Sequence, residues 1–266
     1  MKQKEYILEI NHLNIEFHDH ERPERVVSDV SLMVEAGEIL GIVGESGSGK
    51  TMTALAVAGL LNRKDIEKSG EILFQGKNLL TCERKELREV QGDDIAMIFQ
   101  EPMTSLNPVL KVGRQIEESL VLHTDLDKEK RKERALKLMD EVELDAEVYD
   151  KYPHELSGGM RQRVMIAAAM ICGPQILIAD EPTTALDVTI QEQIVELLQK
   201  LNRQRGTAIL FISHDLSLVR KLCERVVVMD DGKMVEVGLT EEIFNHPKEP
   251  YTKELIASIP RVERKG

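Results

Sequence analysis

The sequence predicts an α/β fold built on a mostly parallel β-sheet with helices on both faces. Short apolar runs alternate with helical segments from the run 176–179 to the run 225–229. This alternation is typical of parallel sheets that are covered on both faces. The apolar run Ile39–Val43 also leads into the glycine-rich stretch 44–51 and then into a segment rich in Ala and Leu. A buried strand, a glycine loop and a helix in this order form the setting that a phosphate-binding loop requires.

Size and composition favour one soluble domain with a small insertion. The chain has 266 residues, of which 42% are apolar and 31% charged. Its net charge of −12 and lack of Trp argue against nucleic acid as the main partner, because an acidic surface repels phosphate backbones. Cys82, Cys172 and Cys223 show no metal-ligand spacing and fit reduced thiols in a cytosolic protein.

No membrane-spanning or secretion signal is found in the sequence. Residues 1–11 carry charges and no long apolar run. No stretch approaches the roughly 20 apolar residues that cross a bilayer. Any membrane role is therefore expected to come through a partner.

The N-terminal third is expected to hold short strands on both sides of the glycine-rich stretch. Alternating or clustered apolar residues predict these strands. The expected strands are 7–10, 13–17, 26–34, 39–43, 71–74 and 95–99, with a helix from Lys50 to Leu61.

The middle of the chain is expected to be helical from Val112 to about Glu147. Within the strongly charged segment 127–147, the apolar residues Ala135, Leu138 or Met139, and Val142 fall on one helix face. The charges are interpreted as the solvated side of that helix.

The second half alternates helices and strands. Ser157 is expected to cap the helix 160–172, because a serine oxygen can accept a hydrogen bond from the first helical turn. The dipeptide Asp231-Gly232 predicts a hairpin between two short apolar runs. The expected elements are strand 176–179, helix 188–202, strand 208–212, helix 216–223 and strand 225–229.

The stretch 44–51 matches the pattern Gly-x-x-x-x-Gly-Lys-Ser/Thr at Gly44, Gly49, Lys50 and Thr51. In this pattern backbone N–H groups surround phosphate oxygens, the lysine reaches the β- and γ-phosphates, and the hydroxyl binds Mg²⁺. ATP and Mg²⁺ are therefore the expected ligands. The expected nucleotide contacts in this segment are Gly44, Glu45, Ser46, Gly47, Ser48, Gly49, Lys50, Thr51 and the residue at position 52, Met52.

A pair of acidic residues follows the apolar strand 176–179 and forms the second part of the predicted site. Asp180 would lie at the carboxyl end of the strand and bind the magnesium ion, commonly through water. Glu181 would accept a proton from the attacking water or orient it.

The stretch Leu156-Ser157-Gly158-Gly159-Met160 decides between families of nucleotide-binding proteins. With it, the chain resembles the nucleotide-binding subunit of an ATP-binding cassette (ABC) transporter. The resemblance implies a P-loop NTPase core with a mostly parallel sheet, an N-terminal antiparallel β subdomain and an α-helical signature subdomain. It also implies that the signature helix faces the γ-phosphate of ATP held by an opposing subunit.

Other elements of this family occur in the expected order. Gln100 matches the glutamine that senses magnesium and the attacking water and faces the membrane subunits, and 185–187 matches the loop that contacts the partner subunit. His214 matches the switch histidine that contacts the γ-phosphate, and Phe17 falls where the family places an aromatic ring against adenine. Glu181, His214 and Gln100 are thus the expected catalytic residues. The run 213–215 is not a nucleophilic triad, because three consecutive side chains cannot converge.

Further motifs resemble the peptide and nickel importer branch. They are 152–155 before the signature, 101–108 after Gln100, and 246–252 through 259–260 in the tail. Many peptide importer subunits continue past this tail into a cysteine-bearing segment, whereas this chain ends at Gly266. Peptides and nickel or other metal chelates therefore both remain open as the cargo.

The resemblance implies a motor subunit on the cytoplasmic face of the membrane. Its expected partners are a second, related ATPase subunit (or a second copy), two transmembrane permease subunits and, indirectly, an extracellular solute-binding protein. Residues 1–260 are expected to form the ATPase domain, with a helical subdomain at about 112–172 and a short tail at 261–266.

Two other functions would share part of this sequence pattern. A soluble ABC ATPase acting on DNA or ribosomes usually carries two cassettes or a long coiled-coil insertion, and the sequence contains neither. A small-molecule kinase would share the phosphate loop, but it would not explain the stretch 156–160.

Overall fold

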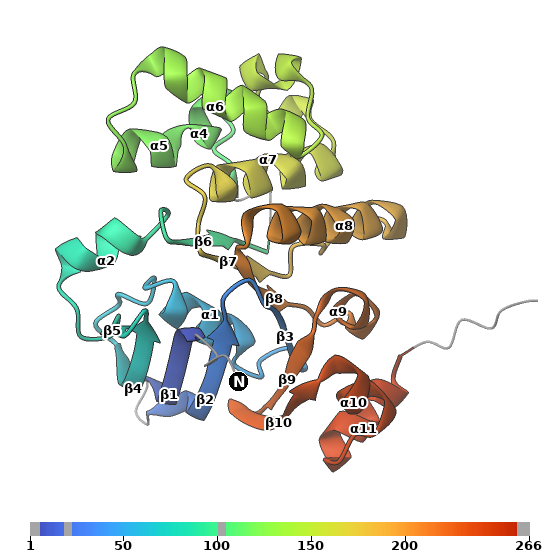
Figure 1. The fold of residues 1–266 in the computed structure, drawn as a ribbon. Coiled ribbons are helices and arrows are strands. Elements are labelled where there is room, and N and C mark those ends of the chain that lie inside the picture. Colours follow the sequence, from blue (N-terminus) through green and yellow to red (C-terminus); the bar gives the residue numbers. More distant parts are fainter. Residues whose placement is uncertain (1–5, 19–22, 101–104, 260–266) are drawn as a thin grey trace, which may run out of the picture.

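The computed structural model describes residues 6–18, 23–100 and 105–259, which form two β-sheets and a separate layer of helices (Figure 1). The helices between residues 112 and 170 lie at the top of this view. A four-stranded sheet lies at the lower left, and a six-stranded sheet runs from the centre, below these helices, to the bottom of the view, beside the four-stranded sheet. This arrangement confirms the predicted α/β fold class with its antiparallel and helical subdomains.

The six-stranded sheet positions the candidate site. Its strands are β3 (Ile39–Val43), β6 (Ile95–Ile98), β7 (Ile176–Asp180), β8 (Ala208–Ile212), β9 (Arg225–Asp230) and β10 (Lys233–Leu239). The order is β10-β9-β3-β8-β7-β6, and every neighbouring pair except β10 and β9 is parallel. The prediction of a mostly parallel sheet is therefore confirmed. Because parallel strands end at the same edge, the residues after β3, β8, β7 and β6 meet there.

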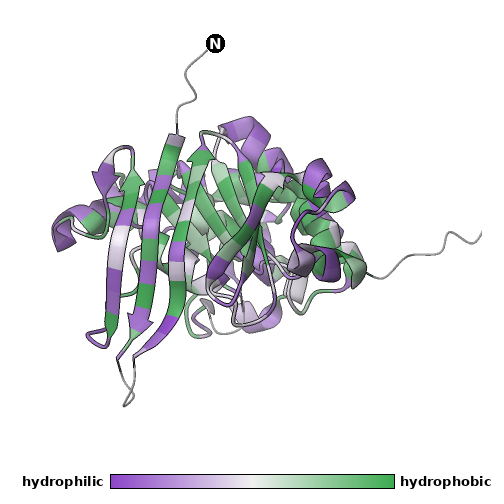
Figure 2. Cartoon of the chain, turned by 90° about the horizontal axis from the view of Figure 1, so that it is seen from below, coloured by the Kyte–Doolittle hydropathy of each residue, from purple (hydrophilic) through white to green (hydrophobic). Residues whose placement is uncertain are grey.

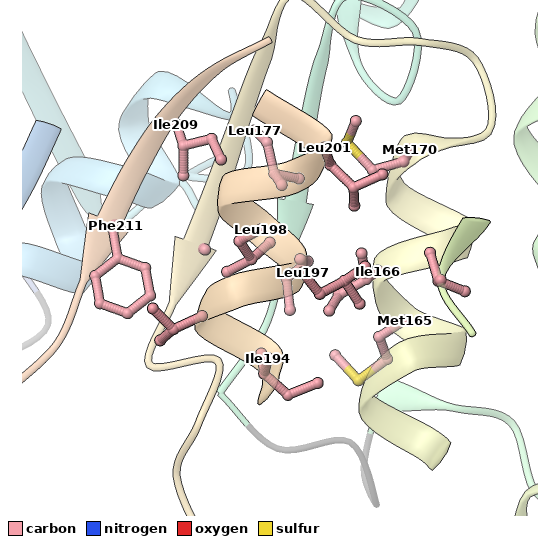
Figure 3. Packing of buried hydrophobic residues seen from close by; sticks show 14 of the residues in the cluster. Met165, Ile166, Met170, Leu177, Ile194, Leu197, Leu198, Leu201, Ile209 and Phe211 are labelled. Carbon is pink, nitrogen blue, oxygen red and sulfur yellow. The ribbon is translucent and has the colours of Figure 1, made fainter. Parts of the chain in front are cut away.

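Both faces of this sheet are buried by alternate residues of the strands. Leu177, Ile209 and Phe211 face a first core under the helices α7 (Gly158–Met170) and α8 (Val188–Arg205). Figure 3 shows this packing, with Ile166 of α7 close to Leu197 of α8. Alternate strand residues, among them Ile178, Leu210 and Ile212, face a second core, which is shared with the antiparallel sheet. Apolar burial on both faces explains why these strands occur as continuous apolar runs in the sequence.

The antiparallel sheet consists of β1 (Tyr6–Phe17), β2 (Glu24–Glu35), β4 (Ile66–Phe74) and β5 (Lys77–Asn78) in the order β2-β1-β4-β5. Hydrophobic and hydrophilic residues alternate along its strands (Figure 2), as expected for a sheet with one buried face. The prediction of two separate strands at 7–10 and 13–17 was wrong. They are one strand, in which His12 adopts a φ of +52° beside a shift of register. Because of this bulge, the apolar side chains of Leu13 and Ile15 are buried like that of Ile10, although the alternation of the sequence breaks between them.

The segment from Val112 to about Glu147 is mostly helical, as predicted. The chain forms several short elements there that fold back on one another. They are α4 (Val112–Ile116), α5 (Glu118–His123), α6 (Lys128–Glu141), two 3₁₀ turns (Ala146–Asp150 and Pro153–Glu155) and α7. The predicted apolar face of α6 is confirmed, since Ala135, Leu138 and Met139 are buried in the first core. A continuous helix would have left the apolar residues of the segment without a common core.

The helix after the phosphate loop, α1 (Lys50–Val57), is shorter than the predicted helix 50–61. Gly59 adopts a left-handed φ of +67°, and this conformation ends the helix. The remaining helices are α2 (Arg84–Val90), α9 (Leu216–Leu222), α10 (Thr240–Asn245) and α11 (Pro250–Ala257). The predicted hairpin is confirmed: β9 and β10 are antiparallel, and Asp231 and Gly232 have φ angles of +44° and +74°.

None of the helices within the described ranges is long and apolar enough to cross a membrane.

Candidate functional site

The glycine-rich loop lies between the central strand β3 and the N-terminus of α1. Gly44 has a φ of +152°, and a Cβ there would lie 2.1 Å from the carbonyl oxygen of Met229. Gly49 begins the helix with a φ of +91°, and the first turn of α1 holds no acidic residue. The positive end of the helix is therefore not neutralised by its own side chains, as an anion site requires.

The other residues of this stretch lie on the loop or under it. Glu45, Ser46 and Gly47 are exposed at its tip, while Ser48 and Gly49 are buried. Thr51 is exposed, and Met52 packs against the second core. The loop thus presents residues 45–47 and 51 outward, and Met52 contributes to packing.

Lys50 is folded into the loop. Its Nζ donates hydrogen bonds to the carbonyl oxygens of Gly44 (2.8 Å) and Glu45 (2.7 Å) and to Ser48 Oγ (3.1 Å). Burial lowers the pKa of this ammonium group, and the carboxylates of Glu181 and Asp180 oppose the shift. The site therefore holds a desolvated cation next to two acids.

Thr51 and Asp180 join the loop to the end of β7. The Thr51 hydroxyl donates a hydrogen bond of 3.2 Å to Asp180 Oδ1. Burial raises the pKa of Asp180, although the hydrogen bond from Thr51 acts against it. A hydroxyl and a carboxylate oxygen suit Mg²⁺, which takes few protein ligands and completes its shell with water and phosphate oxygens. The described residues contain no cluster of three or more His, Cys, Asp or Glu side chains that could hold a metal ion.

Glu181 is the residue on which several strand ends converge. Its Oε2 accepts hydrogen bonds from Gln100 Nε2 (3.0 Å) and Thr184 Oγ1 (2.9 Å) and lies 3.2 Å from His214 Nδ1. Its backbone has a positive φ of +46°, and its N–H donates to the carbonyl oxygen of Ile212 on β8. The three residues expected to be catalytic, Glu181, Gln100 and His214, are thus brought together.

The signature stretch lies at the start of α7. Ser157 Oγ accepts a hydrogen bond of 3.3 Å from the Met160 N–H, which confirms the predicted N-cap. A Cβ on Gly158 would lie 3.3 Å from Leu186 Cδ2, so the loop 185–187 packs beside the start of this helix. Within the described part of the chain, no hydrogen bond or ion pair links residues 157–160 to the loop 44–51. In the described residues, the hydrogen bonds of Ser157 thus hold the start of its own helix, and none of them reaches the phosphate loop.

Phe17 lies at the end of β1, where it pairs with Glu24 and Ile66. Its ring packs on the second core, and the guanidinium of Arg63 lies 5.9 Å from the ring centroid. Its contact with adenine stays a prediction.

Comparison with known proteins identifies the family. Residues 27–184 match the family model described as ABC transporter, and residues 235–266 match the model of the oligopeptide/dipeptide transporter C-terminal region. The dipeptide transport ATP-binding protein DppD of Haemophilus influenzae is 49% identical over 256 residues, which cover 96% of this chain and 78% of the relative. The chain belongs to the ABC transporter ATP-binding family.

This ABC ATPase resembles other members in sequence and in fold. The oligopeptide transport ATP-binding protein OppD of Bacillus subtilis is 48% identical over 263 residues, covering 98% of this chain and 74% of the relative. A solved dimer of an ATP-binding cassette, in a post-hydrolysis state with ADP and Pi, is 29% identical with a TM-score of 0.79. The alignment covers 88% of this chain and 98% of that cassette. The predicted family and fold are confirmed, and the chain is an ATPase.

Two residues of the site in this ABC ATPase were missed by sequence reasoning. Thr184 lies three residues after Glu181 and donates to the same carboxylate oxygen; its place in the run Glu181-Pro182-Thr183-Thr184 was a usable signal. Tyr251 of α11 accepts a hydrogen bond from the Glu45 N–H at 3.1 Å. No local pattern predicts a contact between residues 206 positions apart.

A hollow of about 300 Å³ opens in this ABC ATPase between β6 with Phe99, the residue before Gln100, and the helices α5 and α7. Leu60 and Phe99 on the core side and Leu106 and Met165 on the helical side line it. Leu60 is 43% and Phe99 42% exposed, which is high for large apolar side chains.

Proposed function

We propose that the chain is the ATP-hydrolysing motor subunit of an importer for peptides. The observation that carries the proposal is the convergence on one sheet edge of Lys50, the Thr51–Asp180 pair and the Glu181 carboxylate with its partners Gln100 and His214. Phosphoryl transfer needs positioning and charge stabilisation rather than covalent catalysis, and these groups supply both.

ATP would be held by the loop Gly44–Thr51. Lys50 would leave the carbonyl oxygens of Gly44 and Glu45 and donate to the β- and γ-phosphates instead, where it meets a stronger acceptor. Thr51 and Asp180 would hold Mg²⁺, which when bound neutralises the charge of the phosphates.

Glu181 would act on the water that attacks the γ-phosphate. Its carboxylate would accept the proton of this water or orient the water, and Gln100 and His214 would position the carboxylate and the water. Both Gln100 and His214 already contact Oε2, so one contact must exchange for the water to bind there.

The second half of each reaction centre would come from another ATPase subunit. The Ser157 end of α7 and the loop 185–187 lie together on this chain, yet no hydrogen bond or ion pair links 157–160 to the loop 44–51 in its described part. The positive end of α7 is suited to a γ-phosphate held by the partner. The dimeric form of the similar solved cassette supports pairing. The resemblance to the peptide and nickel importer branch favours a related ATPase subunit over a second copy of this chain.

The hollow between β6 and the helices α5 and α7 would receive a permease subunit. Its apolar lining includes Phe99, and the next residue in the chain, Gln100, donates a hydrogen bond to Glu181. Closure of the pair would then move Gln100 and the helical subdomain, which we place at about 112–172 within an ATPase domain of residues 1–260. The chain would therefore work at the cytoplasmic face of the membrane, with a solute-binding protein outside.

Peptides are the proposed cargo because relatives over nearly the whole chain are named dipeptide and oligopeptide transport proteins. The glutathione import ATP-binding protein GsiA of Salmonella typhimurium, 47% identical over 264 residues that cover 42% of that longer protein, is also compatible with a short peptide. Nickel or another metal chelate is the alternative that the branch allows.

Affinity capture from detergent-solubilised membranes, followed by uptake assays, tests the proposal. Recovery of two membrane subunits is expected, together with uptake of a labelled tripeptide that fails in cells carrying only Glu181→Gln. Exposed Glu133 on α6 provides the matched control, Glu133→Gln, which should transport normally. Recovery of ribosomes or DNA would contradict the importer, and dependence of labelled nickel uptake instead of peptide uptake would reassign the cargo.

A further inference from the structure

The C-terminal helix α11 is fixed against the outermost strand of the six-stranded sheet. Glu236 on β10 accepts hydrogen bonds from the backbone N–H groups of Lys248 (3.0 Å) and Glu249 (3.2 Å). These two residues immediately precede α11, which begins at Pro250. The first turn of α11 is therefore held in place by a carboxylate, in the way that acidic groups stabilise helix N-termini.

The first turn of α11 carries Tyr251, whose hydroxyl reaches the phosphate loop. The N–H of Glu45 donates a hydrogen bond of 3.1 Å to this hydroxyl. The ring is half-buried and packs on the first core, which fixes its direction. A tyrosine hydroxyl is protonated at neutral pH, and burial raises the pKa of Tyr251 further.

Glu45 is thereby held at both of its main-chain polar groups. Its N–H donates to Tyr251, and its carbonyl oxygen accepts from Lys50 Nζ at 2.7 Å. When Lys50 turns to the phosphates of a nucleotide, the carbonyl contact is given up, and the contact with Tyr251 remains to restrain residue 45.

We propose that Tyr251 is a positioning residue of the phosphate loop, through which the C-terminal segment 236–251 sets the affinity for ATP. A loop that is already in its binding conformation loses less freedom when the ligand arrives, and affinity rises accordingly. The proposal rests on the proposed function, since it takes the loop 44–51 as the nucleotide site.

The variant Tyr251→Phe tests this directly, because it removes the hydroxyl and keeps the ring that packs on the core. The dissociation constant of a fluorescent ATP analogue is expected to rise about 3- to 10-fold, the range for one lost hydrogen bond. The turnover number at saturating ATP should stay within about 2-fold, since the hydroxyl does not touch the reacting groups. Tyr6→Phe, the same chemical change on β1, is the matched control and should leave both values unchanged.

Glu236→Gln provides a second and independent variant. It weakens the anchor of α11 without touching the loop, so it should raise the dissociation constant in the parent protein and have a smaller effect in the Tyr251→Phe background. Such non-additivity is the mark of residues that act through one another.

A merely structural hydroxyl would give a different pattern. The midpoint of thermal unfolding without nucleotide would fall, while the nucleotide affinity of the folded protein would stay within about 1.5-fold of the parental value. That result, or full additivity of the two variants, would overturn the proposal. Lys50→Ala in the same titration distinguishes failure of this proposal from failure of the proposed nucleotide site. If Lys50→Ala loses binding and Tyr251→Phe has no effect, only the role of Tyr251 is contradicted. If Lys50→Ala binds as the parent does, the proposed site itself is contradicted.

Discussion

Gln100 donates a hydrogen bond of 3.0 Å to Glu181, which joins the end of β6 to the end of β7 across 81 positions of sequence. The same carboxylate oxygen also accepts from Thr184 and lies 3.2 Å from His214 after β8. The proposed base is therefore surrounded by polar side chains from neighbouring strand ends before any water binds. A movement of Gln100 would change the environment of Glu181 at once, which gives the proposed coupling to a permease a direct physical route.

Replacing Glu181 by Gln should separate binding from hydrolysis. The amide keeps the size and most hydrogen bonds of the side chain but cannot accept the proton of water at neutral pH. We expect ATP binding to be retained, phosphate release to fall at least about 100-fold, and a closed dimer to accumulate in ATP. Phosphate release and size-exclusion chromatography with ATP measure the two effects.

The control for this variant is Glu133→Gln, an equal change of charge on the exposed face of α6. It should hydrolyse ATP at the parental rate and show no ATP-dependent dimer trapping. Parental turnover in Glu181→Gln would refute the role given to this carboxylate.

Replacing Lys50 by Ala should remove tight nucleotide binding. Charge-assisted hydrogen bonds to phosphate are stronger than neutral ones, and their loss should raise the dissociation constant of a fluorescent ATP analogue by about 10- to 100-fold or more. Circular dichroism of the variant checks that the fold persists. A dissociation constant within about 2-fold of the parent would be incompatible with the proposed site.

Asp180→Asn should maintain or raise the thermal stability of the protein without ligand, and it should remove the extra stabilisation that Mg²⁺ gives in the presence of ATP. Burial raises the pKa of Asp180, which means that the folded state disfavours its charge. A neutral amide still accepts from Thr51, so the midpoint of thermal unfolding without ligand should stay within about 2 °C or rise. The additional stabilisation by ATP with Mg²⁺, relative to ATP with EDTA, should disappear. A retained magnesium effect would place the ion elsewhere.

Two substitutions of Ser157 separate its capping role from its proposed role toward the partner's phosphate. Ser157→Ala removes the acceptor for the Met160 N–H and should lower the free energy of unfolding by about 1 kcal/mol. Ser157→Asp keeps a good N-cap and hence the stability, but it brings a negative charge to the helix end that faces phosphate. Chemical denaturation and ATPase assays should therefore show a stable, inactive Ser157→Asp protein. An active one would mean that this helix end does not approach a phosphate.

Strands buried on both faces were the most predictable part of the fold. Ile39–Val43 and Ala208–Ile212 are apolar throughout, and their bounds agree with the sequence prediction. The break at His12 misled the prediction for β1, because a bulge keeps a strand continuous where the alternation of apolar residues stops. The predicted range of the helix α1 was too long, because the helix propensity of Ala and Leu carries no information about the left-handed turn at Gly59.

In the site, motif spacing predicted which residues follow which strand, and the common edge of a parallel sheet brought Lys50, Asp180 and Glu181 together. The contact between Tyr251 and Glu45 could not be predicted in this way. It depends on how α11 docks on β10, which is a tertiary event with no signature in the local sequence.

The central claim is that one molecule supplies only half of each reaction centre. The test measures ATP turnover per chain as the protein concentration is lowered, for this chain alone and together with the proposed second ATPase subunit. Light scattering follows the molecular mass in the same samples. Turnover should fall in step with the dimer fraction and vanish in a preparation that is monomeric. Constant turnover per chain in such a monomeric preparation would contradict the claim.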